Sequence, residues 1–188
     1  MANLALLDTD AAVEQLRAGH VIAYPTEAVF GLGCDPANET AVRKLLSLKD
    51  RHESAGLVLI ASSYSQLRPW VSDLDESLIE KAMQSWPGPV TWLFPRAAGV
   101  PDYVAGNHET IAVRITAHEP SRVLCEAFGS ALISTSANHT AAKPARSVEE
   151  VESYFGHDLS GILAGPLGES DKPSEIRDLV SGNIIRPG

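Results

Sequence analysis

The chain has 188 residues, 44% of them hydrophobic, which supports one buried core and a single domain over residues 1–188. Its formal net charge of −9 excludes a general nucleic-acid-coating surface, because such surfaces depend on Lys and Arg to neutralise phosphates. The 2 cysteines are too far apart for a disulfide framework or a zinc knuckle, and no apolar run approaches the roughly 20 residues of a membrane span, so we expect a cytoplasmic protein.

The first predicted elements are a helix, a strand and a glycine-bearing turn. Asp8 or Thr9 can cap the helix, and Gly19 can end it. The apolar run at residues 20–24 predicts the strand. The segment FGLGCDP at residues 30–36 contains two glycines and a proline, so it predicts a sharp turn.

Helices and a buried strand follow in the middle of the chain. Asn38 can cap a second helix, which ends around residues 49–51. The unbroken apolar run at residues 56–61 predicts a strand buried on both faces. Apolar residues at helical spacing then predict helices over residues 63–70 and 73–86.

The pattern changes to strands in the next part of the chain. Strands are predicted over residues 90–94 and 110–115, and the segment with Pro and Gly between them, residues 95–107, is predicted to be a loop. A helix over residues 119–128 then leads to a short strand at residues 131–134.

The last predicted helix, residues 147–155, begins with a capping box in which Glu150 can reach back to the cap at Ser147. Short strands are predicted near Ile162, Ile176 and Ile184. This order of elements predicts a single α/β domain with a twisted mixed sheet flanked by helices. Ligands in such sheets bind beside the strand ends, where loops converge.

Familiar catalytic and nucleotide-binding motifs are missing from the sequence. It contains no Walker loop, no HExxH motif and no G-x-S-x-G elbow. Gly31-Leu32-Gly33 is followed by Asp35-Pro36 instead of the third glycine of a dinucleotide fingerprint. Metalloproteases, serine hydrolases and the common nucleotide folds are therefore not supported.

Five cations stand beside turns or inside an apolar strand and are candidates for binding one anionic ligand. They are Lys49, Arg51, Arg114, Arg146 and Arg186. Lys49 and Arg51 could either offset a helix macrodipole, an effect of about 0.3–1 kcal/mol, or bind phosphate oxygens. Arg114 shares a strand face with the small Ala112, which fits either an exposed cross-strand ion pair or a bound carboxylate.

Polar side chains gather at three strand ends. Thr26 and Glu27 follow the first strand in a segment that could equally be a plain glycine-assisted turn. Residues 134–138, the sequence STSAN, carry more polar side chains than a turn requires, although helix capping is an alternative. Ser174 and Arg186 each lie at a loop-to-strand junction and indicate a binding site only in combination with the other motifs.

Seven motifs occur in one order along the chain: PTEAVFGLGCDP, LKDR, WPGPVT, TIAVRI, STSAN, PSEIRD and IIRPG. Together they resemble the YrdC/TsaC family over nearly the whole length. The resemblance implies a YrdC-like (YrdC/RibB-type) α/β fold and the short form of the family, with the catalytic domain alone. It also implies a nucleotidyltransferase, an L-threonylcarbamoyladenylate synthase that forms threonylcarbamoyl-AMP and pyrophosphate from L-threonine, bicarbonate and ATP.

The resemblance also assigns binding residues, position by position. The expected ATP-binding residues are Lys49, Arg51, Thr110, Asn138, Arg146 and Arg186. The expected threonine-binding residues are Thr26, Ala28, Arg114, Ser136 and Ser174. Ala28 replaces a threonine of many relatives, His52 replaces a proline, and Ala55-Gly56 replaces Asn-Pro, so the exact shape of these loops differs from the family pattern.

The implied reaction needs no protein nucleophile, because a carbamate formed on the threonine amine attacks the α-phosphorus of ATP itself. The protein would position the substrates and stabilise charge on the phosphates, and we expect Mg²⁺ to accompany ATP without a protein ligand that the sequence identifies. The product is expected to pass to a threonylcarbamoyl transferase complex that modifies tRNA.

Two alternatives stay open at this level. A noncatalytic RNA-binding or ribosome-maturation factor is disfavoured by the acidic charge, although a local basic groove could still contact tRNA. A carbamoyl-transferring domain of hydrogenase maturation has a similar fold, but that multidomain family carries zinc-finger and acylphosphatase-like segments. A chain of 188 residues with 2 cysteines does not accommodate them.

Overall fold

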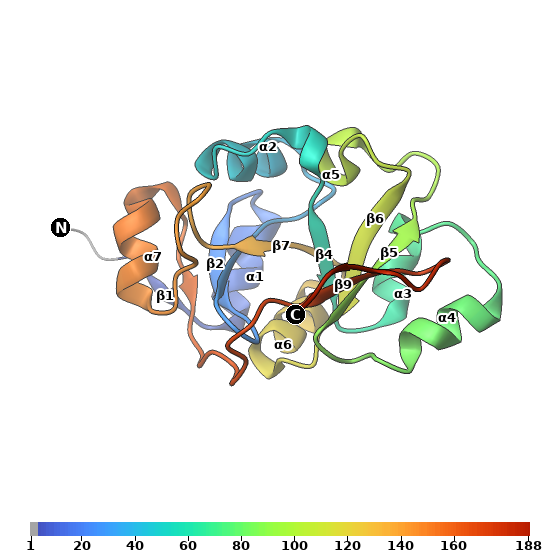
Figure 1. The fold of residues 1–188 in the computed structure, drawn as a ribbon. Coiled ribbons are helices and arrows are strands. Elements are labelled where there is room, and N and C mark those ends of the chain that lie inside the picture. Colours follow the sequence, from blue (N-terminus) through green and yellow to red (C-terminus); the bar gives the residue numbers. More distant parts are fainter. Residues whose placement is uncertain (1–3) are drawn as a thin grey trace.

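The computed structural model describes residues 4–188 and contains a 10-stranded mixed sheet, in the order β1-β8-β2-β3-β7-β4-β6-β5-β9-β10 (Figure 1). The strands are β1 (Leu6–Leu7), β2 (Ile22–Pro25), β3 (Phe30–Gly33), β4 (Val58–Ala61), β5 (Val90–Pro95), β6 (Thr110–Ile115), β7 (Leu132–Ser136), β8 (Ile162–Leu163), β9 (Glu175–Asp178) and β10 (Ile184–Arg186). The mixed α/β architecture predicted from the sequence is confirmed.

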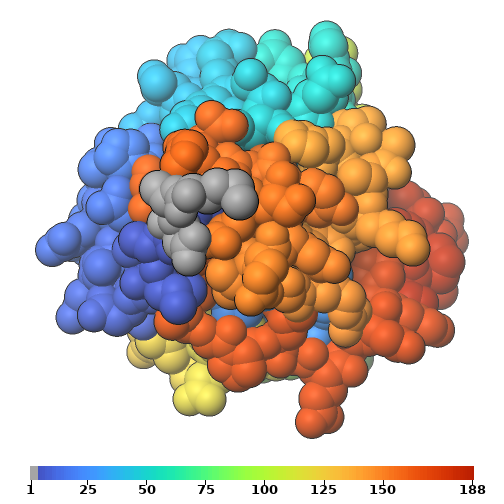
Figure 2. All heavy atoms as spheres, turned by 90° about the vertical axis from the view of Figure 1, so that its left-hand side faces the viewer, coloured from blue at the N-terminus to red at the C-terminus, as the bar shows by residue number. Residues whose placement is uncertain are grey.

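Helices cover both faces of this sheet (Figure 1). They are α1 (Thr9–Arg17), α2 (Glu39–Leu48), α3 (Tyr64–Leu67), α4 (Glu76–Met83), α5 (Asp102–Ala105), α6 (Glu119–Phe128) and α7 (Val148–Phe155). Seen from the end of the sheet that carries β1, α7 and its neighbouring segments lie at the centre of the molecule's face (Figure 2). Within residues 4–188, no helix is both long and apolar enough to cross a bilayer.

Side chains alternate between two hydrophobic cores, as the period of a strand requires. In β4, Leu59 and Ala61 belong to the larger core, which includes the buried residues of α2. Ile60 points to the opposite face and joins the smaller core with residues of α1 and α6. Because both faces are covered, the strand is apolar throughout, and this explains why the run at residues 56–61 is readable from the sequence.

The predicted caps at Asp8, Asn38 and Ser147 form, but Glu150 of the capping box accepts from the Arg146 N–H, one residue before the predicted donor at Ser147. Asp8 accepts a hydrogen bond from the Ala11 backbone N–H at 2.9 Å, and Asn38 accepts one from Ala41 at 3.0 Å. Ser147 caps α7 through the N–H of Glu150, whose carboxylate accepts from the Arg146 N–H at 2.6 Å. These bonds satisfy backbone donors that have no partner inside the helix.

The turn predicted at residues 30–36 is wrong in its first half, because Phe30–Gly33 forms β3 and pairs antiparallel with β2. The glycines serve close packing here. The ring of Tyr24 lies over Gly33, and its hydroxyl donates to the Ile133 carbonyl of β7 at 3.0 Å. A side chain at Gly33 would occupy the space that the ring needs.

The segment between β5 and β6 was predicted to be a loop, yet it contains the helical turn α5, and Ala105 of this turn lies on the cavity described below. The helix predicted at residues 63–70 stops at Leu67 and continues as a 3-10 turn. Pro69 has no N–H for the α-helical hydrogen-bond ladder, which accounts for the change. The predicted helix at residues 73–86 is shortened to α4.

Gly33→Ala tests the packing of β3. The added methyl carbon would lie 2.5 Å from Tyr24 Cε1 and 2.6 Å from the Ile133 carbonyl oxygen, so we expect a loss of about 2–3 kcal/mol in unfolding free energy. Gly31→Ala is the matched control in the same strand, since its nearest contacts would be 3.2 and 3.4 Å. Urea denaturation measures both variants, and equal losses would contradict the role given to Gly33.

Candidate functional site

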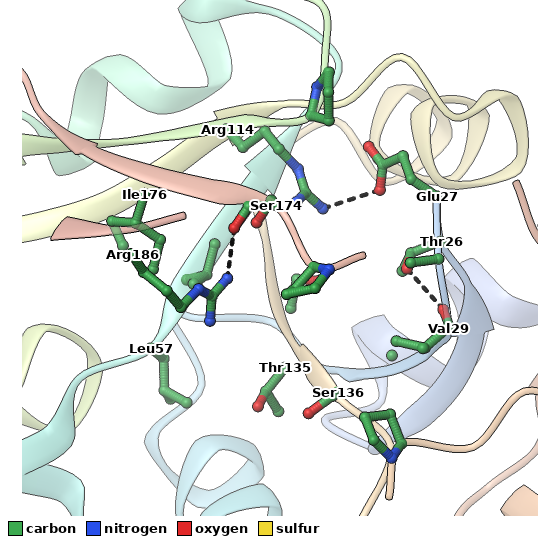
Figure 3. Close-up of a pocket in the computed structure, with 18 of the residues that line it drawn as sticks. Thr26, Glu27, Val29, Leu57, Arg114, Thr135, Ser136, Ser174, Ile176 and Arg186 are labelled. Atoms are coloured by element: carbon green, nitrogen blue, oxygen red, sulfur yellow. Dashed lines mark hydrogen bonds and ion pairs between the residues drawn. The ribbon is translucent and has the colours of Figure 1, made fainter. Parts of the chain in front are cut away.

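A cavity of about 790 Å³ lies where several strand ends and loops meet (Figure 3). One wall comes from the β2–β3 connection at residues 26–29, and another from β6 and the end of β7. The segment at residues 170–174 and the strand β10 complete it. The site therefore depends on several strands and loops that are far apart in sequence rather than on one local motif.

Most residues predicted to bind ligands line this one cavity. They are Thr26, Ala28, Arg51, Thr110, Arg114, Ser136, Arg146, Ser174 and Arg186. Ala112 also lines it, as expected for the small residue that shares a strand face with Arg114. The two remaining predicted residues, Lys49 and Asn138, are not on the cavity wall but lie directly behind it.

Lys49 holds the strand end that forms one side of the cavity. It is buried, and its Nζ donates to the carbonyl oxygens of Ser136 and of Asn138, the latter at 2.8 Å. Burial, assisted by the nearby Arg51, lowers the pKa of Lys49 to about 8. The ammonium group has no carboxylate among these partners, so its charge is balanced by carbonyl dipoles alone.

Asn138 supports the loop that follows β7. Its side-chain amide donates to the carbonyl oxygens of His139 at 2.8 Å and Ala142 at 2.9 Å. Its Oδ1 faces Lys49 Nζ at 3.5 Å. Both amide donors are thus used within the protein, and the structure gives Asn138 a supporting position between Lys49 and the cavity loop.

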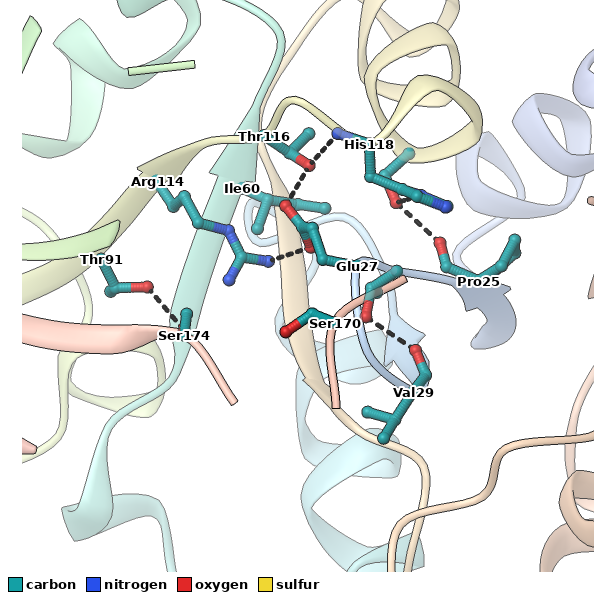
Figure 4. A network of polar contacts seen from close by, with 12 residues as sticks. Pro25, Glu27, Val29, Ile60, Thr91, Arg114, Thr116, His118, Ser170 and Ser174 are labelled. Atoms are coloured by element: carbon teal, nitrogen blue, oxygen red, sulfur yellow. Dashed lines mark hydrogen bonds and ion pairs between the residues drawn. The ribbon is translucent and has the colours of Figure 1, made fainter. Parts of the chain in front are cut away.

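Arg114 forms an ion pair with Glu27 on the cavity wall (Figure 4). Arg114 Nη2 lies 3.1 Å from Glu27 Oε2, and the side chains are 8% and 18% exposed. The second carboxylate oxygen accepts from the Thr116 hydroxyl at 2.7 Å. Thr116 in turn accepts from the His118 backbone N–H at 3.2 Å, so the carboxylate is fixed from behind.

This pair differs from the exposed cross-strand ion pair that the sequence suggests as one possibility. Arg114 is 7% exposed, so it is not part of an exposed cross-strand ion pair. Its partner comes from the β2–β3 connection rather than from a neighbouring strand. No local pattern predicts the pairing, because 87 residues separate Glu27 from Arg114.

Two guanidinium groups on the cavity wall have an unpaired buried donor. Within residues 4–188, three buried side-chain nitrogens have no hydrogen-bond partner: Arg51 Nε, Arg114 Nε and Trp70 Nε1. Two of them belong to guanidinium groups on the cavity wall. Burying a donor without an acceptor costs roughly 1–3 kcal/mol, so these two guanidinium groups are incompletely satisfied by the protein.

Backbone carbonyl groups hold the guanidinium groups of Arg51 and Arg186 in place. Arg51 donates to the Gly56 carbonyl at 2.8 Å, and Arg186 donates to the Ser174 carbonyl at 2.7 Å. Burial lowers the pKa of Arg51, and burial together with the nearby Arg114 lowers the pKa of Arg186. The shift at Arg186 thus reflects a neighbouring positive charge as well as burial, whereas the shift at Arg51 reflects burial alone.

The hydroxyl of Thr26 is committed to the protein. It donates to the Val29 carbonyl at 2.7 Å, so toward the cavity its oxygen can only accept a hydrogen bond. The neighbouring Ala28 is 7% exposed and presents a methyl group. This part of the wall therefore offers an acceptor and an apolar surface.

Several wall residues were absent from the predicted set, namely Glu27, Lys143, Asp171 and Lys172. Glu27 stands inside the PTEAVFGLGCDP motif, so its position in that motif was an available signal. The lysines lie in loops of ordinary polar composition, and nothing in the sequence distinguishes them from solvated surface residues.

No group of three or more His, Cys, Asp or Glu side chains that could hold a metal ion occurs in residues 4–188. The cavity wall has two carboxylates, Glu27 and Asp171, and Glu27 is already bonded to Arg114 and Thr116. The donor set thus fits a cation that arrives with its own oxygen ligands.

Comparison with protein families identifies the chain. The family model Sua5/YciO/YrdC, described as "Telomere recombination", matches residues 14–188. The chain belongs to the Sua5/YciO/YrdC family. A family member from Halorhodospira halophila named threonylcarbamoyl-AMP synthase is 50% identical over 93% of this chain and 92% of its own. A synthase of the same name from Coxiella burnetii is 46% identical over 93% and 94%.

Solved structures of the family share the fold. Sua5 of P. abyssi complexed with L-threonine matches with a TM-score of 0.88 and 30% identity over 96% of this chain. The chain spans 54% of that protein, so little more than half of Sua5 is represented here. A phosphate- and nucleotide-bound HypF matches with a TM-score of 0.78 at 14% identity, a likeness of fold alone.

Removing Glu27 tests the buried ion pair. Glu27→Ala leaves Arg114 without its counter-charge, and we expect a loss of about 2–4 kcal/mol in unfolding free energy. Glu27→Gln keeps an oxygen acceptor and should lose less. Glu126→Ala, which breaks an ion pair with Arg122 whose side chains are 40% and 65% exposed, is the control and should change stability by less than about 1 kcal/mol. A Glu27→Ala loss no larger than this control would contradict the assignment.

Proposed function

We propose that this chain is a threonylcarbamoyl-AMP synthase, an enzyme that forms threonylcarbamoyl-AMP and pyrophosphate from L-threonine, bicarbonate and ATP. The observation that carries the proposal is the cavity, in which guanidinium groups from distant segments face one space with unpaired donors. Relatives bearing the synthase name share about half of their residues with this chain over nearly their full length. Those relatives support the enzymatic interpretation over a noncatalytic RNA-binding factor.

The charges divide the cavity into two parts. Arg51, Arg146 and Arg186 carry no carboxylate partner among the ion pairs of residues 4–188, which suits a triphosphate. Lys49 and Asn138 support this part from behind, and Thr110 lies on its wall. We assign these side chains to ATP.

The part around Arg114 is assigned to threonine. Arg114 and Glu27 are opposite charges side by side, which matches the zwitterion of an amino acid. Ser136 and Ser174 add hydroxyl groups, and Thr26 with Ala28 adds an acceptor and a methyl surface. The single methyl group that distinguishes threonine from serine can provide only about 1–3 kcal/mol of selectivity in binding.

The reaction follows from positioning rather than from a protein nucleophile. The neutral amine of threonine adds to carbon dioxide with loss of a proton, or to bicarbonate with loss of water, and forms a carbamate. A carbamate oxygen then attacks the α-phosphorus, and the bond from that phosphorus to the bridging oxygen breaks to release pyrophosphate. Arg51, Arg146 and Arg186 stabilise negative charge on the phosphate oxygens during this displacement. The cavity walls shield the carbamate from water.

Magnesium is proposed to enter with the nucleotide. Mg²⁺ prefers phosphate and water oxygens with one or two carboxylates, and Asp171 is the wall carboxylate without a bond to Arg114 or Thr116. When bound, the ion would neutralise charge on the phosphates. The protein's own cations then hold and orient the triphosphate.

The setting of the reaction is also a proposal. The product, a reactive mixed anhydride, would pass to a threonylcarbamoyl transferase complex that modifies adenosine in tRNA. With a net charge of −9, any contact between this chain and tRNA would have to be local. We place the enzyme in the cytoplasm, where tRNA and ATP are available.

The direct test is incubation of the chain with L-threonine, bicarbonate, Mg²⁺ and ATP, followed by mass spectrometry and pyrophosphate detection. We expect threonylcarbamoyl-AMP to form only when every substrate is present. Arg51→Ala should lower kcat/KM for ATP at least about tenfold, because a buried charge-assisted contact is lost. Arg122→Ala, an exposed arginine of α6, is the control. Threonine-independent ATP breakdown, or no turnover, would overturn the proposal.

ATP binding should also depend on pH through Lys49. The folded chain holds the pKa of Lys49 at about 8, below the ordinary value of 10.5, so the ammonium loses its proton as pH rises through that range. Phosphates favour the charged form of Lys49, so ATP binding should raise the pKa of Lys49. Above about pH 8, ATP binding should therefore take up a proton, and the affinity for ATP should fall toward about pH 9.5. Calorimetry in buffers of different ionisation enthalpy measures the uptake.

Lys49→Met should abolish the proton uptake at high pH. At pH 7 the wild-type lysine is already charged, so little uptake is expected from it there. Identical proton uptake by wild type at pH 7 and at pH 9 would contradict the role of Lys49, whether or not the variant folds.

A further inference from the structure

Thr91, in the WPGPVT motif, has no role in the reaction described so far. It is fully buried in β5, with 0% exposure, and it is not among the cavity-lining residues. Its strand lies between β6, which carries Arg114, and β9, which begins directly after Ser174. Thr91 is therefore the middle member of a row across three strands (Figure 4).

The sheet register places these side chains on one face. Trp92 pairs with Val113 in the antiparallel β5–β6 ladder, so the next residues outward, Thr91 and Arg114, lie opposite one another. Opposite residues of neighbouring strands project from the same side. On the other edge, β9 runs parallel to β5 and brings Ser174 to within 3.0 Å of Thr91, measured between the two hydroxyl oxygens.

The direction of this hydrogen bond follows from burial. In the part of the chain that the structure describes, Ser174 Oγ is the hydrogen-bond partner of Thr91 Oγ1. If Ser174 donated, the Thr91 proton would be buried without an acceptor, at a cost of roughly 1–3 kcal/mol. Thr91 therefore donates and Ser174 accepts, which leaves the proton of Ser174 free for another acceptor.

That free proton faces the cavity. Ser174 lines the cavity, and its backbone carbonyl is already occupied by Arg186 Nη2 at 2.7 Å. Arg114, on the same face, is 7% exposed and has an unpaired Nε. Arg114 and Ser174 thus flank Thr91 on one face of the sheet and both line the cavity, so a carboxylate bound there can contact both side chains.

We propose that Thr91 is a positioning residue that makes Ser174 a hydrogen-bond donor toward the carboxylate of the amino-acid substrate, alongside Arg114. This inference rests on the proposed function, since threonine is the amino acid in question. Thr91 acts only through Ser174 and does not touch the substrate. Without the Thr91 hydroxyl, Ser174 can rotate, and the substrate must orient it on binding.

Thr91→Val, which replaces the hydroxyl by a methyl of similar size, tests the proposal. The dissociation constant and KM for L-threonine should rise about three- to tenfold, the effect of one oriented neutral hydrogen bond. The KM for ATP and kcat should stay within about twofold. Thr91→Ser keeps the hydroxyl and should restore threonine affinity, which a purely structural role for the β-branched side chain would not allow.

A double-mutant cycle separates this mechanism from general damage. In a Ser174→Ala background, Thr91→Val should cause no further loss of threonine affinity, because its only route of action is gone. Thermal unfolding should show the double variant at least as stable as Ser174→Ala, since no buried hydroxyl is left unpaired. Additive losses of affinity would overturn the proposal.

Calorimetric titration with L-threonine distinguishes failure of the proposed reaction from failure of the role given to Thr91. Wild type that binds threonine but forms no adenylate would overturn the proposed reaction, and the same titrations would still test Thr91. Wild type that binds no threonine would overturn both. Active wild type with an unchanged threonine affinity in Thr91→Val would overturn the role of Thr91 alone.

Discussion

The structure depends on the gathering of positive charge that the protein itself does not neutralise. Lys49, Arg51 and Arg186 are held by backbone carbonyl oxygens rather than by carboxylates. Dipoles can orient these cations without cancelling their charge, and burial lowers the pKa of all three. Binding of an anion to such a site is favourable, because the anion supplies the missing counter-charge. The cations come from segments between the end of α2 and β10, so these segments must meet at one place for the site to form.

Much of the fold could be predicted because local chemistry determines it. The apolar run of β4 and the caps at Asp8 and Asn38 are short-range signals, and the structure confirms them. The strand β3 could not be predicted in the same way. Its glycines are typical of a turn, whereas Gly33 makes room for the ring of Tyr24, whose hydroxyl reaches Ile133 of β7. That requirement arises only after the strands have paired.

The candidate site shows the same division. Nearly all of the side chains expected from the family resemblance line one cavity, because ordered motifs carry positional information that single residues lack. It did not reveal that Lys49 and Asn138 stand behind the wall, nor that Glu27 pairs with Arg114. Such contacts join residues far apart in sequence, so they follow from the sheet order rather than from any local pattern.

The Glu27–Arg114 pair gives the two halves of the cavity different responses to ionic strength. Around this pair the charges cancel at short range, so an amino-acid zwitterion meets little net field there. Around Arg51, Arg146 and Arg186 the field is uncompensated by carboxylates, and mobile salt ions compete with phosphate oxygens for it. With the substrates placed as we propose, added salt would therefore weaken attraction of the nucleotide while leaving capture of the amino acid nearly unchanged.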